Sequence, residues 1–272
     1  MKKTILFTGV IALLFAACTQ QNKTDVSILY PNWAEGIAMT HLAKVALEDK
    51  GFTVDIKRIE PGPIYAALAK GDADVYMDAW LPYTHADYWE KYGDQIDSLG
   101  VVFDNGMTGL VVPDYVDIQS IEALNANKEK FDGKIFGIAA GAGIHANTLK
   151  AIDAYGLEFE QMTSSETSMM TALKKAVSAN EWVVITGWKP HFMWTEYNLK
   201  ALEDPKGLYP VDEIRIISRK GFADDQPEIA AFFSKFVMEE SLLYELINAV
   251  NSDRDPMVGA KAFYEKHRSM FE

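Results

Sequence analysis

The sequence predicts an α/β protein of two lobes that close like a clamshell over a ligand cleft. From Val26 onward, short apolar strands alternate with helical stretches, which is typical of a mostly parallel sheet. Near Pro113 a strand runs into a polar segment, and beyond it the same alternation starts again on a second apolar core. Two such units joined by two crossing strands form a clamshell with its cleft between them.

The first unit shows clear helix boundaries. Gly51 and Gly71 end its two helices, because glycine readily adopts the conformation that terminates a helix. Pro61 opens the second helix, since proline is tolerated in a first turn. Open sheets of this kind bind ligands beyond the carboxyl ends of their strands. The expected elements are strands at 26–30, 53–58 and 73–77 and helices at 34–50 and 61–71.

The second unit follows a polar crossing segment, and the chain then returns to the first. We expect strands at 134–139 and 182–186, helices at 146–155 and 169–179, a returning strand at 213–218, and terminal helices at 226–236, 241–250 and 256–270. The terminal helices would pack back on the first lobe. The first lobe would then comprise residues 26–112 and 213–272, and the second lobe residues 113–212.

The N-terminus has the pattern of an export signal. Lys2 and Lys3 precede an apolar run over residues 5–17 that is too short for an ordinary membrane span. This run ends in small residues before Cys18, the single cysteine of the chain, and resembles a bacterial lipoprotein cleavage site. We therefore expect residues 1–17 to be a signal peptide, Cys18 a lipid attachment site and residues 18–25 a tether. An ordinary signal peptide with a chance cysteine is the alternative.

The charge of the chain excludes one class of partner. Its 39 acidic residues exceed its 26 basic residues, for a formal net charge of −13. Nucleic acid binding requires basic patches to match the phosphates, so a nucleic acid partner is not expected. The charge fits a solvated extracytoplasmic protein.

Three tryptophans indicate a ligand site. Trp33, Trp80 and Trp188 each follow a strand-like run and precede a polar turn containing glycine or proline. We expect all three at loop mouths at the strand ends. Three converging aromatic faces suit a quaternary ammonium group, which carries positive charge but has no hydrogen to donate. Trp89, Trp182 and Trp194 have spacing that is more typical of core packing.

Two further segments offer polar groups to a ligand. His85 follows Trp80 closely, and we expect it in the first turn of a helix that Thr84 could cap. Gly141-Ala142-Gly143-Ile144 follows a strand and opens a helix, which exposes N–H groups to an anion the size of a carboxylate. A plain tight turn fits the same glycines equally well. We assign His145 to a loop.

Neither a metal site, a cofactor site nor a catalytic centre is predicted. Asp72, Asp74 and Asp78 alternate along a strand, but no histidine or cysteine completes a metal set with them, and we interpret them as ordinary strand-end acids. The third glycine of a dinucleotide fingerprint is missing after Gly143. The sequence also lacks Gly-x-Ser-x-Gly, His-Glu-x-x-His and P-loop motifs. We therefore expect a binding protein and not an enzyme.

The motifs together resemble a known family. The segments that carry the resemblance are 32–38, 78–85, 141–144, 187–191 and 219–222, and it covers the chain from Val26 to the C-terminus. In these segments the chain resembles the glycine betaine/proline betaine substrate-binding proteins of ABC transporters, which carry an OpuAC-type domain. The resemblance implies a type II periplasmic-binding-protein fold. It also implies an ABC permease and its ATPase subunit as partners.

The resemblance assigns roles to particular residues. It implies that Trp33, Trp80 and Trp188 surround the ligand cation, and that Gly143 and Ile144 amides, assisted by His85, hold the ligand carboxylate. Ala34 and Glu35 would lie at the cleft rim. Binding of choline or carnitine is the alternative ligand preference. An exported choline-ester hydrolase and a sensory binding module are the alternatives from other classes.

Overall fold

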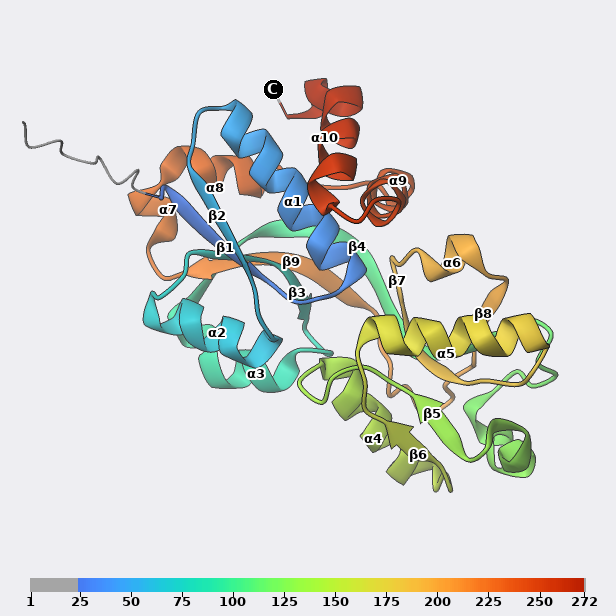
Figure 1. Ribbon diagram of the computed structural model, residues 1–272. Coiled ribbons are helices and arrows are strands. Elements are labelled where there is room, and N and C mark those ends of the chain that lie inside the picture. Colours follow the sequence, from blue (N-terminus) through green and yellow to red (C-terminus); the bar gives the residue numbers. More distant parts are fainter. Residues whose placement is uncertain (1–23, 272) are drawn as a thin grey trace, which may run out of the picture.

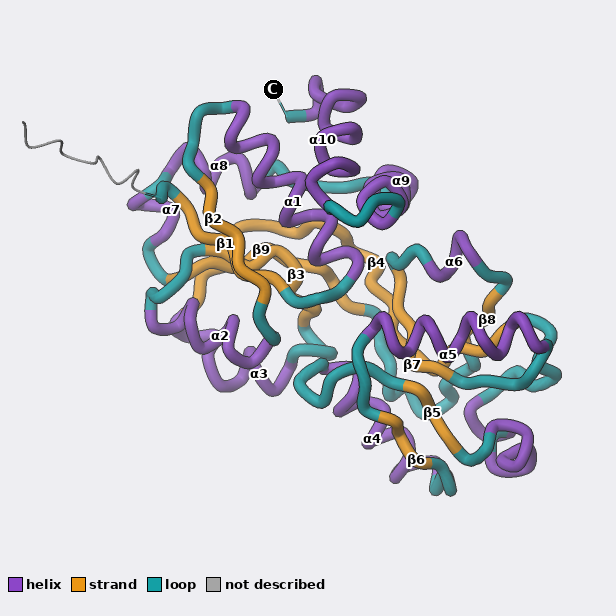
Figure 2. The backbone as a smooth tube through the Cα atoms, viewed as in Figure 1, coloured by secondary structure: helices purple, strands orange, loops and turns teal. Residues whose placement is uncertain are grey.

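The computed structural model describes residues 24–271 of the 272-residue chain. Within these residues the strands form one hydrogen-bonded path, β2-β1-β3-β9-β4-β7-β5-β6, with β8 paired to β4. The path divides between two lobes that Figure 1 shows connected through β4. Helices lie outside the strands in both lobes (Figure 2). The two-lobed α/β class predicted from the sequence is confirmed.

The first lobe is built on β1, β2, β3 and β9. Strands β1 and β2 are parallel, as are β1 and β3, whereas β9 is antiparallel to β3. Helices α1, α9 and α10 pack together on one side of the sheet, and α2 and α3 lie on the other (Figure 1). The elements are β1 (Val26–Tyr30), α1 (Ala34–Asp49), β2 (Val54–Arg58), α2 (Pro61–Lys70), β3 (Val75–Leu81), α3 (Ala86–Tyr92), β9 (Asp212–Arg219), α7 (Phe222–Asp225), α8 (Pro227–Ser234), α9 (Glu240–Asn251) and α10 (Pro256–His267).

Strand β4 (Ile96–Pro113) connects the lobes. Its first part pairs with β9, up to Gly106 opposite Asp212, and its last part pairs with β7 from Met107 onward. The chain returns to the first lobe where β9 begins, at the same junction. These two passages lie close to the proposed lobe boundaries after residues 112 and 212. That division of the chain remains a proposal.

The second lobe is smaller and is built around β5, β6 and β7. Its elements are β5 (Lys134–Phe136), α4 (Gly143–Tyr155), β6 (Glu160–Met162), α5 (Glu166–Ala179), β7 (Ile185–Lys189), α6 (Met193–Glu196) and β8 (Leu199–Ala201), preceded by 3₁₀ turns at Ile121–Ala123 and Asn125–Phe131. Parallel pairing joins β5 to both β6 and β7.

Several boundaries in the second lobe differ from the prediction: β5 ends at Phe136 and not at Ala139, and α5 begins at Glu166 and not at Met169. The strand expected at 182–186 begins only at Ile185, so Trp182 precedes it and lies under the Lys130 ammonium, 4.1 Å from the ring centroid. Helix α4 starts three residues before the expected Ala146, which places His145 in its first turn and not in a loop. Apolar runs alone do not locate strand and helix ends, because the pairing partners that determine them are remote in sequence.

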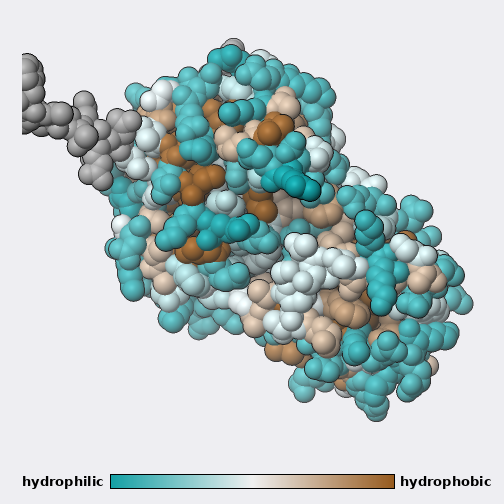
Figure 3. Space-filling view, in the orientation of Figure 1, coloured by the Kyte–Doolittle hydropathy of each residue, from teal (hydrophilic) through white to brown (hydrophobic). Residues whose placement is uncertain are grey.

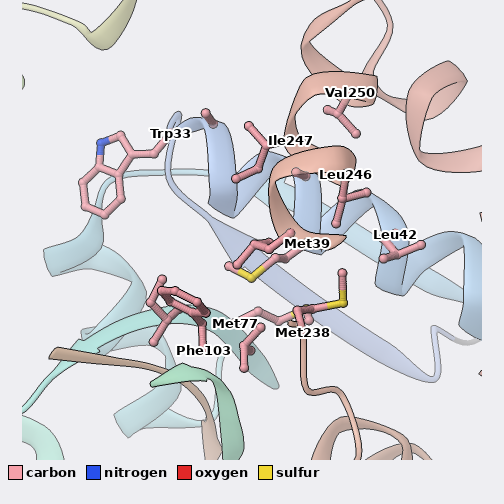
Figure 4. Close-up of a cluster of buried hydrophobic side chains, with 14 of the residues drawn as sticks. Trp33, Met39, Leu42, Met77, Phe103, Met238, Leu246, Ile247 and Val250 are labelled. Carbon is pink, nitrogen blue, oxygen red and sulfur yellow. The ribbon is translucent and has the colours of Figure 1, made fainter. Parts of the chain in front are cut away.

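The hydrophobic core extends from the first lobe to the cleft. Figure 4 shows Met39, Met77, Leu246 and Ile247 packed between α1, α9 and the sheet. Trp33 lies at the edge of this cluster with its indole directed away from it (Figure 4). On the face in Figure 3, hydrophilic side chains cover most of the periphery of both lobes.

The predicted signal peptide (residues 1–17), Cys18 and most of the tether lie outside the described residues. Among residues 24–271, no helix combines the length and apolar character needed to cross a membrane. The same residues contain no cluster of three or more His, Cys, Asp and Glu side chains that could hold a metal ion.

Candidate ligand-binding site between the lobes

A small, largely buried cavity lies between the two lobes. All six residues predicted as ligand contacts line it. The first lobe supplies Trp33, Trp80 and His85, and the second supplies Gly143, Ile144 and Trp188. The remaining lining residues are Glu35, Thr84, Thr108, Ile138 and Ala142. The three tryptophans are at most 7% exposed, so the lobes are closed over the cavity.

The tryptophans occupy different structural positions from those predicted. Trp33 stands directly before α1 as its N-cap residue, in agreement with a loop end. Trp80 and Trp188, expected in loops, instead lie within β3 and β7. Both strands continue through these residues because antiparallel neighbours pair with them, Ile214 opposite Trp80 and Thr108 opposite Trp188. Sheet hydrogen bonds therefore fix the backbones that carry both rings.

Two buried carboxylates orient the strand tryptophans. The Trp80 Nε1–H donates to Asp78 Oδ1 at 2.8 Å, and the Trp188 Nε1–H donates to Glu35 Oε2 at 2.8 Å. The second bond crosses from one lobe to the other. Asp78 is 1% exposed and Glu35 is fully buried. The interpretation of Asp78 as an ordinary strand-end acid was wrong, as was the placement of Glu35 at the cleft rim.

The environment of these carboxylates disfavours their ionised form. Burial raises the pKa of both Glu35 and Asp78 well above the usual range. The nearby Asp78 and Glu166 carboxylates raise the pKa of Glu35 further. Glu35 Oε1 and Asp78 Oδ2 have no hydrogen-bond partner among the described residues. Glu35 in the cavity wall and Asp78 outside the lining thus both gain from a neighbouring positive charge.

The sequence analysis did not identify Glu35 and Asp78 as partners of the tryptophans, although Asp78 has a local signal. Asp78 precedes Trp80 by two residues on one strand, so their side chains share a face of the sheet. Glu35 lies in the first turn of α1, two residues after Trp33. The spacing of Asp78 and Trp80 indicates their hydrogen bond, whereas the partner of Glu35 is Trp188 in the other lobe and not the nearby Trp33.

His85 presents a hydrogen-bond donor to the cavity. It is the N-cap residue of α3, one position before the predicted first turn, and Thr84 does not cap this helix. The Trp80 backbone N–H donates to His85 Nδ1 at 3.1 Å, which assigns the ring proton to Nε2. Burial lowers the pKa of His85 to about 3, so the ring is neutral near pH 7. Its Nε2 is buried and has no partner among the described residues.

The first turn of α4 faces the same cavity from the second lobe. Gly143 and Ile144 are the first two residues of this helix, so their N–H groups have no partner within it. Helix N-termini favour anions because their N–H groups point outward and the helix dipole is positive there. A Cβ atom at Gly143 would lie 1.9 Å from the Thr84 carbonyl oxygen of the first lobe. Only glycine permits this approach of the two lobes.

Fold and cavity together define a class of protein. Two α/β lobes enclose an aromatic cavity with unpartnered polar groups, which is the architecture of a clamshell ligand-binding protein. The chain matches the substrate binding domain of the ABC-type glycine betaine transport system over residues 24–266 and belongs to this family. The family is a transport family and not an enzyme family.

Individual relatives agree with this membership. The chain is 36% identical over 143 residues to the glycine betaine/carnitine transport binding protein GbuC of Listeria monocytogenes, an alignment that spans 51% of this chain and 48% of that protein. Lactococcal OpuAC, solved closed and complexed with glycine betaine, superposes with a TM-score of 0.86 at 31% identity, covering 92% of this chain and 98% of OpuAC. ProX from Borrelia burgdorferi superposes equally well, with a TM-score of 0.86 at 31% identity over 90% of this chain and 94% of ProX.

Proposed function

We propose that this protein is the substrate-binding component of an ABC importer for glycine betaine or a related quaternary ammonium solute. The observation that carries the proposal is a closed cavity with three indole rings and, at the same site, a neutral histidine donor and a helix N-terminus. A betaine carries a trimethylammonium group, which matches the indole rings, and a carboxylate, which matches the histidine donor and the helix N-terminus.

Trp33, Trp80 and Trp188 hold the ligand cation. A trimethylammonium group cannot donate conventional hydrogen bonds, so its recognition depends on ring faces and shape. Each ring contributes about 0.5–2 kcal/mol, or roughly 2–6 kcal/mol for three. Glu35 and Asp78 stand behind two of these rings and add favourable charge when ionised. Micromolar affinity corresponds to about 8 kcal/mol, so the rings alone fall short of it.

The remaining binding free energy comes from the ligand carboxylate, which binds on the opposite side of the cavity from the cation. This carboxylate accepts from the N–H groups of Gly143 and Ile144 and from His85 Nε2. Hydrogen bonds to a charged group contribute about 1.5–3 kcal/mol each. Two or three such bonds bring the total to roughly 5–15 kcal/mol, a range that includes the value for micromolar affinity. A zwitterion therefore uses the cavity more fully than a simple cation.

Choline is the second candidate ligand, favoured by one observation. Glu35 Oε1 is buried at the cavity and unpartnered among the described residues, so it could accept a hydrogen bond from a hydroxyl group. Choline has such a hydroxyl but no carboxylate. It would leave the Gly143, Ile144 and His85 donors without a partner, which costs affinity relative to a betaine.

The partners and location follow from the transport role. The closed form is recognised by a permease, which an ATPase subunit drives, and binding proteins of ABC importers work outside the cytoplasm. We further propose that residues 1–17 direct export and that Cys18 carries a lipid that anchors the protein to the membrane. Mass spectrometry of the membrane-extracted protein tests the anchor: an unmodified Cys18 or a chain cleaved elsewhere rejects it.

Titration of the intrinsic fluorescence tests the ligand. Glycine betaine is expected to give a saturable change with wild-type protein, a much weaker one with Trp80→Ala, and competition by choline only at higher concentration. Trp182→Ala serves as the control, because Trp182 lies outside the cavity in the second lobe. Absence of any saturable response to betaines and choline in the wild type would reject the proposal.

A further inference from the structure

At the start of helix α1, each lobe binds a carboxylate of the other lobe. Trp33, the N-cap residue of this helix, uses its side chain in the cavity wall and provides no cap. The Ala34 N–H donates instead to Glu166 Oε2 of the second lobe at 3.1 Å. A carboxylate at a helix N-terminus satisfies a free N–H group and interacts favourably with the helix dipole. One lobe thus caps a helix of the other.

Glu166 lies at the start of helix α5, beside a buried histidine. It is the first residue of α5, whose N-cap Ser165 accepts from the Ser168 N–H. Its second oxygen, Oε1, lies 3.1 Å from Nε2 of the fully buried His191. His191 Nδ1 accepts from the Met193 N–H at 2.9 Å, so the proton resides on Nε2. This Nε2 lies near the Glu166 carboxylate but does not form a hydrogen bond to it. The His191 ring in turn packs edge-on against Trp188, 4.7 Å between centroids.

Glu35, the residue after Ala34, makes a contact in the opposite sense, with the carboxylate on the first lobe and the donor on the second. Glu35 extends from α1 into the second lobe and accepts from Trp188 Nε1, as described above. Consecutive residues of α1 therefore bind two groups of the second lobe, one as donor and one as acceptor. Both contacts exist only while the lobes are closed. Glu166 does not line the cavity, so it acts without touching a ligand.

We propose that Glu166 is a positioning residue that latches the closed lobes and sets the rate of ligand release. It stabilises the closed state through the Ala34 N–H and through His191, which supports Trp188. Ligand entry occurs in the open state, where these contacts are absent. The inference about release rests on the proposed ligand-binding function, whereas the latch contact itself does not.

Kinetics of Glu166→Ala test the release rate. With glycine betaine followed by stopped-flow fluorescence, we expect dissociation about tenfold faster, corresponding to about 1.4 kcal/mol, and an unchanged association rate. Glu166→Gln keeps an acceptor for the Ala34 N–H and should recover part of the loss. Glu160→Ala, an exposed carboxylate of the same lobe, is the control. Equal changes in association and dissociation rates, or none, would overturn the proposal.

Hydrogen exchange at the Ala34 amide provides a readout that does not require a ligand to be known. Glu166→Ala should accelerate exchange of this amide severalfold relative to wild type and Glu160→Ala. In a second arm, saturating glycine betaine should protect the amide only when Glu166 is present. Unchanged exchange refutes the latch. If Glu166→Ala exchanges faster but the wild-type protein binds neither betaines nor choline, the latch contact is supported and the proposed ligand is rejected.

Discussion

Substitution of Gly143 by alanine tests whether the cavity depends on the close approach of the lobes. The new Cβ would lie 1.9 Å from the Thr84 carbonyl oxygen, where about 3.0 Å is the closest approach that such atoms show. Thr84 O is a backbone atom, and the Thr84 N–H is held by Asp212 Oδ2 at 3.0 Å. The loop cannot easily shift, so we expect the lobes to remain partly open.

The expected loss of binding free energy equals the contribution of the contacts that the second lobe no longer makes with the ligand when it stays open. An open second lobe removes the Trp188 ring, about 0.5–2 kcal/mol, and two hydrogen bonds to the ligand carboxylate, about 1.5–3 kcal/mol each. The sum of about 3.5–8 kcal/mol corresponds to at least a roughly 300-fold weaker affinity for glycine betaine. Isothermal titration calorimetry on wild type and Gly143→Ala measures this loss directly.

A matched control lies two residues away. A Cβ at Gly141 would meet only the Tyr88 hydroxyl, at an ordinary contact distance of 3.8 Å. Gly141→Ala should therefore bind within a few-fold of wild type. Both variants should retain the wild-type unfolding temperature without ligand, because neither substitution strains a single lobe. Wild-type affinity in Gly143→Ala would refute the closed geometry on which the reasoning rests.

Two further predictions follow from the buried polar groups. Trp188→Phe keeps an aromatic ring but removes the N–H that bonds Glu35, and a buried acceptor left without a donor costs about 1–3 kcal/mol. Calorimetry should therefore show glycine betaine affinity reduced about 10- to 100-fold. Trp182→Phe should leave the affinity unchanged, and equal effects of the two variants would contradict the role of the indole N–H. Burial lowers the pKa of His85 from 6.5 to about 3 in the folded state, so the unfolded chain takes up this proton first, and the associated stability is complete above pH 6.5 and decreases as the pH falls toward 3. The free energy of unfolding changes by up to about 1.4 kcal/mol per pH unit through this group. Urea unfolding between pH 5 and 7 should therefore show a steeper pH dependence of this free energy for wild type than for His85→Asn. Parallel curves for the two proteins would show that His85 does not titrate in this way.

Much of the fold was predictable because its signals are local. The helix ending at Gly71 is an example: this residue has φ +76, a conformation that favours glycine, and the helix stops there in both the prediction and the structure. The strand of residues 26–30 was likewise located by its apolar run. In contrast, the length of β4 was not predicted, because its partners β7 and β9 lie far along the chain.

The candidate site likewise contains some residues that the sequence predicts and others that it does not. Trp33, Trp80 and Trp188 were selected by residue type and by their distance from strand-like runs, and the structure brings them together at one cavity. Glu166 carried no comparable signal, since its partner Ala34 is 132 residues away. Neither was it predictable that His85 would be neutral, because its pKa depends on burial by neighbours from several elements.

The sequence by itself determined the α/β class, the two-lobed order of elements and the set of aromatic and glycine residues available for a ligand. These properties depend on hydrophobic periodicity and on the chemistry of single residues, which are readable along the chain. Only the tertiary structure decided that Glu35 and Asp78 are buried behind the tryptophans, that His85 directs a neutral donor at the cavity, and that Glu166 caps a helix of the opposite lobe. Burial and the contacts of Glu35 and Glu166 between the lobes involve residues distant in sequence, so no local pattern encodes them.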